Sequence, residues 1–120
     1  MTQASERRKH RRALYKRPLH VQTVSSSKIG NVFEVKNQTL SAQGRDISEG
    51  GFGIDVTSAF KPGAILKISF KIGAQDESEA EAYVRVVWTQ RDKHGLQFLM
   101  LEDSTLRKIR GYIGDAERAP

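Results

Sequence analysis

The sequence contains no cysteine among its 120 residues. This excludes a disulfide scaffold, a thiolate metal site and a cysteine nucleophile, and it is typical of a reducing compartment. Long apolar runs are also missing, whereas a membrane-spanning helix needs about 20 such residues. The N-terminal region, where a signal peptide would have its apolar core, is rich in arginine and lysine instead. We therefore expect a cytoplasmic protein that inserts no segment into a membrane.

The excess positive charge is concentrated near the N-terminus. The net charge is +6, and residues 1–17 hold seven basic side chains and a single acid, Glu6. The rest of the chain carries thirteen charges of each sign and is neutral. Because residues 1–17 contain only Leu14 and Tyr15 as large apolar groups, we expect a flexible basic arm ahead of one domain over residues 18–120. Such an arm suits an anionic partner.

Most of residues 18–120 has the period-2 hydrophobic pattern of β-strands. Six or so short strands are predicted, near residues 19–24, 31–37, 43–57 (two strands broken at the glycine pair), 66–72, 84–88 and 96–100. A turn is predicted over Ser25–Ser27 and Gly30, and Trp88 is assigned to a core face. Short strands at this spacing indicate a mainly β domain, either a small closed barrel or a sandwich.

Only the C-terminal region is predicted to be helical. Asp103 or Ser104 is suited to cap a helix, and the apolar residues Leu106, Ile109 and Ile113 follow at i, i+3 and i+7 spacing. Gly114 is expected to end this helix.

The residues needed for catalysis are not clustered in the sequence. His10, His20 and His94 have no ligand-like spacing to each other or to carboxylates. Ser48 does not lie in a nucleophile elbow, and no phosphate-cradling glycine loop is present. We therefore expect that the protein is not an enzyme, and that it has no catalytic residue, no metal site and no cofactor.

Two short segments have patterns that point to binding. The first is the basic run Arg7–Arg12, which taken alone is equally well explained as a solvated tail. The second is Asp46–Ile54, which taken alone is a strand ending in a glycine-rich turn. Asp46 and Ser48 are two positions apart on this strand, so both are expected on its outer face. Gly51 follows where a larger side chain would obstruct a ligand or where a positive φ is needed.

Together these segments resemble the PilZ domain family, whose members are receptors for the bacterial second messenger cyclic di-GMP. Arg8 and Arg12 fit the family's RxxxR motif, with Arg7 ahead of it and Pro18 behind it. Arg7 and Arg11 have the same spacing, and the position of Pro18 favours the register of Arg8 and Arg12. The family's (D/N)xSxxG motif is matched without substitution by residues 46–51. The resemblance implies a six-stranded antiparallel β-barrel with a C-terminal α-helix, and a non-catalytic receptor that passes its signal to a downstream protein.

The resemblance also implies a set of ligand-binding residues: Arg7, Arg8, Arg12, Asp46, Ser48, Gly50 and Gly51. Their chemistry suits cyclic di-GMP. Arginine binds phosphate through its planar fork, reads guanine O6 and N7, and stacks on a base. An aspartate accepts from the N–H edge of guanine, which arginine cannot read. The protein is expected to be a monomer or a homodimer.

Two other functions are compatible with a small barrel that has a basic arm. One is nucleic-acid binding, which the neutral charge of residues 18–120 and the assignment of Trp88 to the core disfavour. The other is a protein–protein adaptor with a PilZ-like fold, which the presence of the arginine motif disfavours. We therefore expect cyclic di-GMP and a protein as partners, and no nucleic acid.

Overall fold

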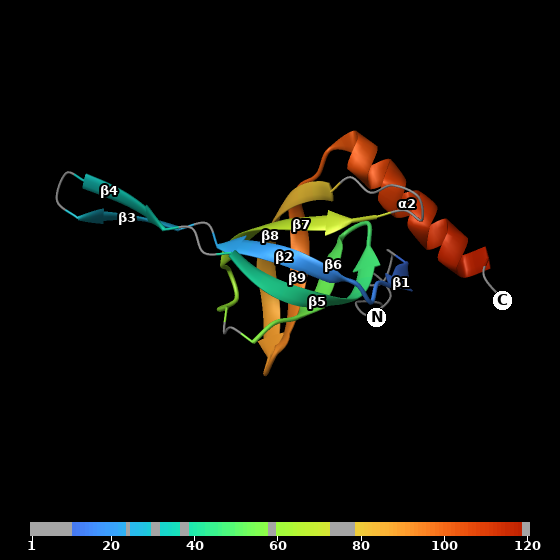
Figure 1. The fold of residues 1–120 in the computed structure, drawn as a ribbon, viewed down its shortest axis with the longest axis horizontal. Coiled ribbons are helices and arrows are strands. Elements are labelled where there is room, and N and C mark those ends of the chain that lie inside the picture. Colours follow the sequence, from blue (N-terminus) through green and yellow to red (C-terminus); the bar gives the residue numbers. More distant parts are fainter. Residues whose placement is uncertain are drawn as a thin grey trace, which may run out of the picture.

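The computed structural model describes residues 11–23, 25–29, 32–36, 39–57, 60–72 and 79–118. The strands are β1 (Arg12–Leu14), β2 (Pro18–Thr23), β3 (Ser25–Ile29), β4 (Val32–Lys36), β5 (Thr39–Ser48), β6 (Gly51–Asp55), β7 (Ile65–Lys71), β8 (Glu79–Gln90) and β9 (Lys93–Met100). One helix, α2 (Asp103–Arg118), follows them. Figure 1 shows the barrel with α2 at one side. Within these ranges, no helix is both long and apolar enough to cross a membrane.

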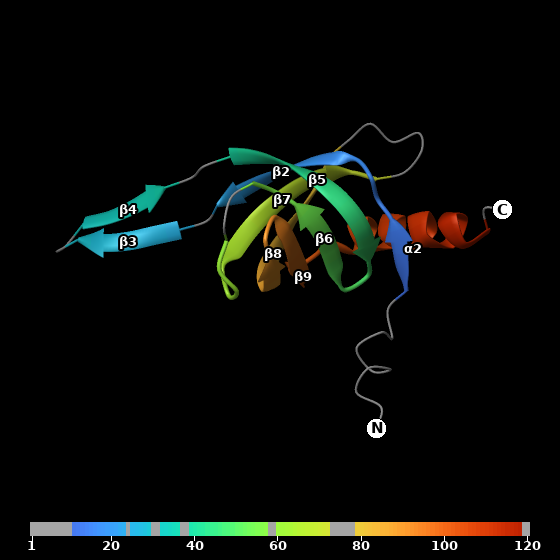
Figure 2. The same cartoon turned by 90° about the horizontal axis from the view of Figure 1, so that it is seen from below.

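Six of the described strands close into an antiparallel barrel. They are hydrogen-bonded in the order β5-β2-β7-β8-β9-β6, and β6 returns to pair with β5. Strand β1 lies outside the closed barrel and pairs antiparallel with β5. Figure 2 shows the curved strands surrounding the interior, with α2 beside them. The predicted fold, a six-stranded antiparallel barrel with a C-terminal helix, is thereby confirmed.

The side chains that alternate along the strands fill the barrel. On β7, Leu66, Ile68 and Phe70 are almost completely buried, as their alternation predicted. Tyr15 is also fully buried, and its ring packs edge-on against Phe52 with centroids 5.0 Å apart. The core therefore includes a residue from the segment that the sequence assigned to the basic arm.

Burial of Tyr15 is the main difference from the expected arm. Its hydroxyl donates to the carbonyl of Lys71, and its amide donates to the carbonyl of Arg45 at 3.0 Å. A Cβ on Gly44 would clash with the Tyr15 ring, so this glycine provides the space that the ring occupies. Ala13 is buried as well. Two apolar side chains thus suffice to order residues 12–15, because they enter an existing core. Residues 1–10 lie outside the described residues.

A separate two-stranded sheet, β3–β4, projects from the barrel on the side away from the C-terminal end of α2 (Figure 1). Its register pairs Ser25 with Lys36 and Ile29 with Val32. The predicted strand near 31–37 is present. The predicted turn over Ser25–Ser27 is wrong, because these residues form β3. The three serines show no alternation of apolar and polar residues that would predict a strand. They are part of β3 because their backbone pairs with β4.

Helix α2 begins at Asp103, one of the two residues predicted to cap it, but it does not end at Gly114. It continues to Arg118, because glycine inside a helix costs only about 1 kcal/mol and does not by itself end the helix. Ile109 and Ile113 are buried, and the hydroxyl of Tyr112 donates to the carbonyl of Leu14 at 2.7 Å. The helix is therefore attached to β1.

Stability should depend on pH through Tyr15. Desolvation raises the pKa of the buried Tyr15 hydroxyl above its ordinary value of 10.0. Because the unfolded chain releases this proton first, the free energy of unfolding should fall as pH rises above about 10. Urea denaturation at pH 8 and above pH 10 measures this slope. A Tyr15→Phe protein should have a shallower slope; an unchanged slope would assign the effect to other groups.

Candidate functional site

The pairing of β1 with β5 brings the two sequence motifs together. In this register Arg12 lies opposite Ser48, and Leu14 lies opposite Asp46. The Nη1 atom of Arg12 is 3.2 Å from Oδ1 of Asp46, and the Arg12 side chain is 62% exposed. The ion pair is therefore open to solvent on the arginine side. Because β1 and β5 are paired neighbours in one sheet, residues 34 positions apart in sequence meet at one place.

Ser48 shapes the turn that follows β5. Its Oγ accepts hydrogen bonds from the amides of Gly50 and Gly51, at 3.1 and 3.2 Å. Sequence alternation predicted Ser48 on the outer face beside Asp46, but Ser48 is nearly buried. The turn folds back over the side chain, which the alternation of a straight strand does not describe. A hydroxyl that accepts two bonds still has one proton to donate.

Gly51 is required by strand pairing. It lies opposite Gln97 of β9, and a Cβ at this position would overlap the carbonyl oxygen of Leu96. The positive φ that was one expected reason for Gly51 is wrong, because the only glycine with positive φ in the described ranges is Gly63. The other expected reason, space for a ligand, stays a prediction. Close approach of the β9 backbone is the reason for a glycine here.

A hollow of about 520 Å³ connects the two motifs to strands β8 and β9. We call it the Arg12–Ser48 hollow. It is lined by Arg12, Ser48, Gly50, Gly51, Phe52, Val87, Trp88, Gly95, Leu96 and Gln97. Asp46 is joined to the hollow through its ion pair with Arg12. The structure therefore brings together five predicted residues: Arg12, Asp46, Ser48, Gly50 and Gly51. Arg7 and Arg8 lie outside the described residues.

Trp88 was missed as a site residue because its alternation placed it in the core. Its side chain is 41% exposed. The register of β8 against β9 shifts between Val86 and Trp88, and this irregularity turns the indole outward. The indole lies against Gly95 of β9, since a Cβ on this glycine would overlap the ring. The guanidinium of Arg45 lies 5.7 Å from the centre of the indole ring. The sequence signal for this arrangement is a tryptophan followed, on the next strand, by a glycine that leaves room for its ring: Trp88 and Gly95.

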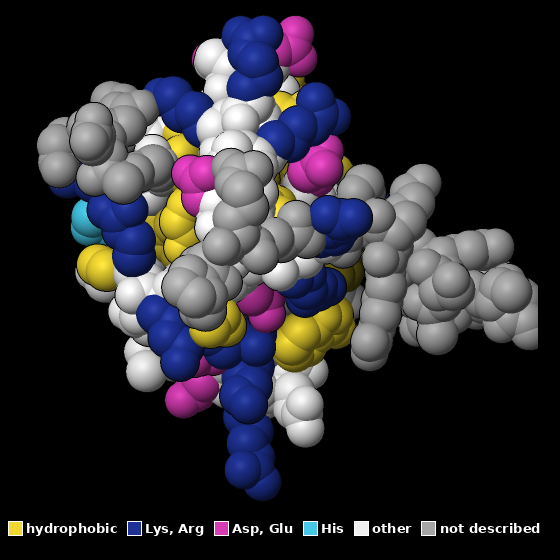
Figure 3. Space-filling view, turned by 90° about the vertical axis from the view of Figure 1, so that its right-hand side faces the viewer, with side chains coloured by type: hydrophobic (Ala, Val, Ile, Leu, Met, Phe, Trp, Pro, Cys, Tyr) yellow, Lys and Arg dark blue, Asp and Glu magenta, His cyan; other side chains and the backbone are white. Residues whose placement is uncertain are grey.

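The charges around the site are mixed, with arginine prominent. Arg45 forms an ion pair with Asp55, with Nε and Oδ1 2.9 Å apart. Arg110 of α2 forms an ion pair with Glu49, with Nε and Oε1 2.7 Å apart. Figure 3 shows the side of the molecule at the right of Figure 1, where Lys and Arg side chains are distributed with single acids between them. In the described part of the chain, no group of three His, Asp or Glu residues is arranged to hold a metal ion. The site is suited to an anionic ligand with hydrogen-bonding edges.

The role of Gly51 can be tested by substitution. Gly51→Ala should lower the free energy of unfolding by at least about 2 kcal/mol, because the methyl group forces β6 and β9 apart. Gly111→Ala is the matched control: a Cβ there meets open space in the middle of α2, so this variant should be more stable by about 0.5–1 kcal/mol. Urea denaturation of both proteins measures the difference. Equal stabilities would contradict the role given to Gly51.

Comparison with known proteins adds to this geometry. The family model for the PilZ domain matches residues 6–115. Among solved structures, the chain is similar to the PilZ domain with c-di-GMP of YcgR from Escherichia coli, with a TM-score of 0.63 and 19% sequence identity. That match covers 93% of this chain and 92% of the other. At this identity the likeness shows the fold. No curated protein matches the chain at a significant level.

Proposed function

Because the chain belongs to the PilZ domain family, we propose that it is a non-catalytic receptor for cyclic di-GMP that passes the signal to a partner protein. The observation that carries this proposal is the meeting of Arg12 with the residue 46–51 motif at one hollow. Neither motif is specific alone. Their juxtaposition provides a cation, a carboxylate and a hydroxyl within one site, which a ligand with phosphates and guanine bases requires.

In the proposed complex, arginine and aspartate have separate tasks. Arg12, together with Arg7 and Arg8, binds phosphate oxygens and the O6 and N7 atoms of guanine. Asp46 accepts hydrogen bonds from the N1–H and N2–H groups of a guanine. In the structure Asp46 is paired with Arg12, so the ligand replaces an exposed ion pair, whose contribution to stability is about 0–1 kcal/mol. Breaking the Arg12–Asp46 ion pair therefore costs little free energy when the ligand binds.

Ser48, Gly50 and Gly51 shape the floor of the proposed site, and Trp88 offers an aromatic face. The Ser48 hydroxyl fixes the turn and retains a proton to donate to the ligand. The half-exposed indole of Trp88 lines the same hollow and can stack on a base, a contact worth about 1–3 kcal/mol.

The proposed signal is a conformational change, and α2 is the element placed to report it. Tyr112 donates to the carbonyl of Leu14 on β1, and Arg110 pairs with Glu49 beside the Ser48 turn. Both contacts join α2 to elements that carry proposed ligand-binding residues. Rearrangement of Arg12 and Asp46 on binding therefore changes the surroundings of the helix, and a partner can recognise the difference.

The experiment that tests this function is prolonged incubation of the protein with cyclic di-GMP, followed by ultrafiltration and chromatography of both fractions. The nucleotide should be retained with the protein and recovered intact. Absence of retention would contradict the receptor. Appearance of the linear dinucleotide, absent from a control without protein, would contradict the non-catalytic part of the proposal.

Replacement of Asp46 by alanine should weaken binding by about 10–100-fold, because one charged contact to a guanine edge is lost while the phosphate contacts remain. Asp55→Ala is the matched control, since it removes another acid of the β5–β6 region that pairs with Arg45 and not with Arg12. Fluorescence titration with a labelled cyclic di-GMP measures both. Equal losses in the two proteins would contradict a specific role for Asp46.

A further inference from the structure

Most of the exposed apolar side chains in the described ranges lie on three neighbouring strands of the barrel. Seven large hydrophobic residues are exposed in the described ranges, and six of them lie on β7, β8 and β9: Ile65, Tyr83, Val87, Trp88, Leu99 and Met100. Met100 is 68% exposed. Single exposed apolar residues are normal, but a contiguous group marks a surface that another molecule covers.

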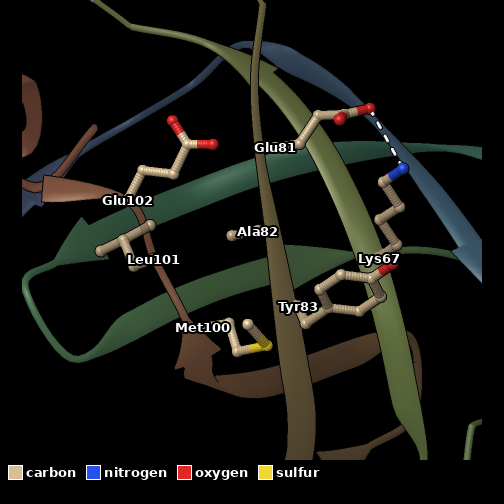
Figure 4. A pocket seen from close by; sticks show the side chains of 7 residues that line it. All are labelled: Lys67, Glu81, Ala82, Tyr83, Met100, Leu101 and Glu102. Carbon is tan, nitrogen blue, oxygen red and sulfur yellow. Dashed lines mark ion pairs between the residues drawn. The ribbon is translucent and has the colours of Figure 1, made fainter. Parts of the chain in front are cut away.

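A groove of about 360 Å³ lies at one end of this face. We call it the β8–β9 groove. Ala82 and Leu101 form its floor, and Tyr83 and Met100, which are paired across the two strands, lie together at one end (Figure 4). Tyrosine provides large contact area at low entropic cost, and methionine adapts its shape to a partner. These side chains suit an inserted apolar group.

The other end of the groove is acidic. Glu81 and Glu102 lie there with their carboxylates on either side of Ala82 (Figure 4). Glu81 forms an ion pair with Lys67, in which Nζ of the lysine is 3.4 Å from Oε2 of the glutamate. A second hollow adjoins the groove through Glu81 and Glu102, and its lining adds the carboxylate of Glu79 and the ammonium group of Lys108. Three acids and two lysines, Lys67 and Lys108, give this end a net charge of −1, in contrast with the +6 of the chain as a whole.

We propose that the β8–β9 groove docks a short segment of a downstream protein in which apolar side chains accompany a lysine or arginine. The apolar side chains contact Tyr83 and Met100, and the basic group lies between Glu81 and Glu102. Complementary charge fixes the orientation of the segment, while the buried aromatic and methionine contacts provide most of the affinity. This inference rests on the proposed receptor function, because it names a docking surface for the partner of a receptor without catalytic groups.

The groove and the Arg12–Ser48 hollow lie on the same two strands. Between them, Nη2 of Arg85 donates to Oε1 of Gln97 at 2.7 Å, and Gln97 lines the hollow. Val87 and Trp88, which line the hollow, are exposed on the far side of this polar pair from Tyr83 and Met100. A partner that covers this face therefore touches both the docking groove and the edge of the ligand site, so ligand occupancy alters part of the surface that it contacts.

Selection of phage-displayed peptides of about 12 residues on the full chain tests the proposal. Enriched peptides should combine aliphatic or aromatic residues with a nearby Arg or Lys. A synthetic copy of the best peptide, titrated by calorimetry, should bind Tyr83→Ala/Met100→Ala and Glu81→Gln/Glu102→Gln at least about tenfold more weakly than wild type. Asp92→Asn is the matched control and should bind the peptide normally, because Asp92 is an exposed acid in the turn between β8 and β9 and does not line the groove.

The affinity of each variant for cyclic di-GMP separates this proposal from the receptor function. Both groove variants should bind the nucleotide as wild type does, since none of the four residues lines the Arg12–Ser48 hollow. Peptides without a basic residue, or peptide affinities unaffected by the groove substitutions, would overturn the docking proposal. If the free wild-type protein self-associates and the Tyr83→Ala/Met100→Ala variant does not, the docking proposal is overturned, because a second copy of the chain then occupies the groove. Normal peptide binding without nucleotide binding would overturn only the receptor function.

Discussion

Replacement of Arg12 by alanine should weaken the binding of cyclic di-GMP by about 100-fold or more. The proposed contact of its guanidinium with phosphate comprises two charged hydrogen bonds, each worth about 1.5–3 kcal/mol. The fold should change little. Arg12 is 62% exposed and its ion pair with Asp46 lies at the surface, so the free energy of unfolding should fall by no more than about 1 kcal/mol.

Arg11→Ala is the matched control for this prediction. It removes the same charge from the preceding position, which belongs to the alternative RxxxR register of Arg7 and Arg11. Arg8→Ala should behave as Arg12→Ala does, whereas Arg11→Ala should retain most of the affinity. Calorimetric titration measures all three variants. Wild-type affinity of Arg12→Ala, with a large loss in Arg11→Ala, would show that the other register binds the ligand.

Replacement of Tyr15 by alanine should lower the free energy of unfolding by about 3–5 kcal/mol, the usual cost of deleting a large buried aromatic side chain. Tyr15 is fully buried, its ring contacts Phe52 and Phe70 edge-on, and its hydroxyl donates to the carbonyl of Lys71. It also fixes the position of β1, so ligand binding should weaken even where the variant remains folded.

Tyr15→Phe separates these two effects. It keeps the ring in the core and loses the hydrogen bond to Lys71, so stability should fall by only about 1–3 kcal/mol. Affinity for cyclic di-GMP should remain close to that of wild type, because β1 stays in place. Urea denaturation and titration of the same samples give both values. A Tyr15→Ala protein as stable as wild type would show that β1 is not attached through the core.

Local patterns predicted most of the barrel. The alternation of Leu66, Ile68 and Phe70 identified β7, because period-2 burial is a property of a few consecutive residues. The helix start at Asp103 was likewise a local signal. The pairing of β1 with β5, which places Arg12 opposite Ser48, depends on residues far apart in sequence. The resemblance to a known family, and not the periodicity, indicated that these residues form one site.

The features that the sequence did not predict depend on tertiary contacts. Trp88 faces outward because of an irregularity in the β8–β9 pairing, which no alternation pattern records. Ser48 is covered by the turn that its own hydroxyl stabilises. Tyr15 is ordered by a core that other strands build, so the composition of its own segment was a poor guide. Trp88 and Tyr15 therefore depend on partners far away in the sequence, whereas Ser48 depends on the backbone of the turn that follows it.

Calorimetric titration of the full chain with cyclic di-GMP, and with GTP and cyclic GMP as controls, tests the central claim most directly. The account predicts saturable binding of cyclic di-GMP with a dissociation constant of about 1–10 μM or lower, which corresponds to a binding free energy of roughly −7 to −8 kcal/mol or better. GTP and cyclic GMP should produce no comparable heat. A flat titration with cyclic di-GMP at high protein concentration, or equal affinity for GTP, would contradict the account.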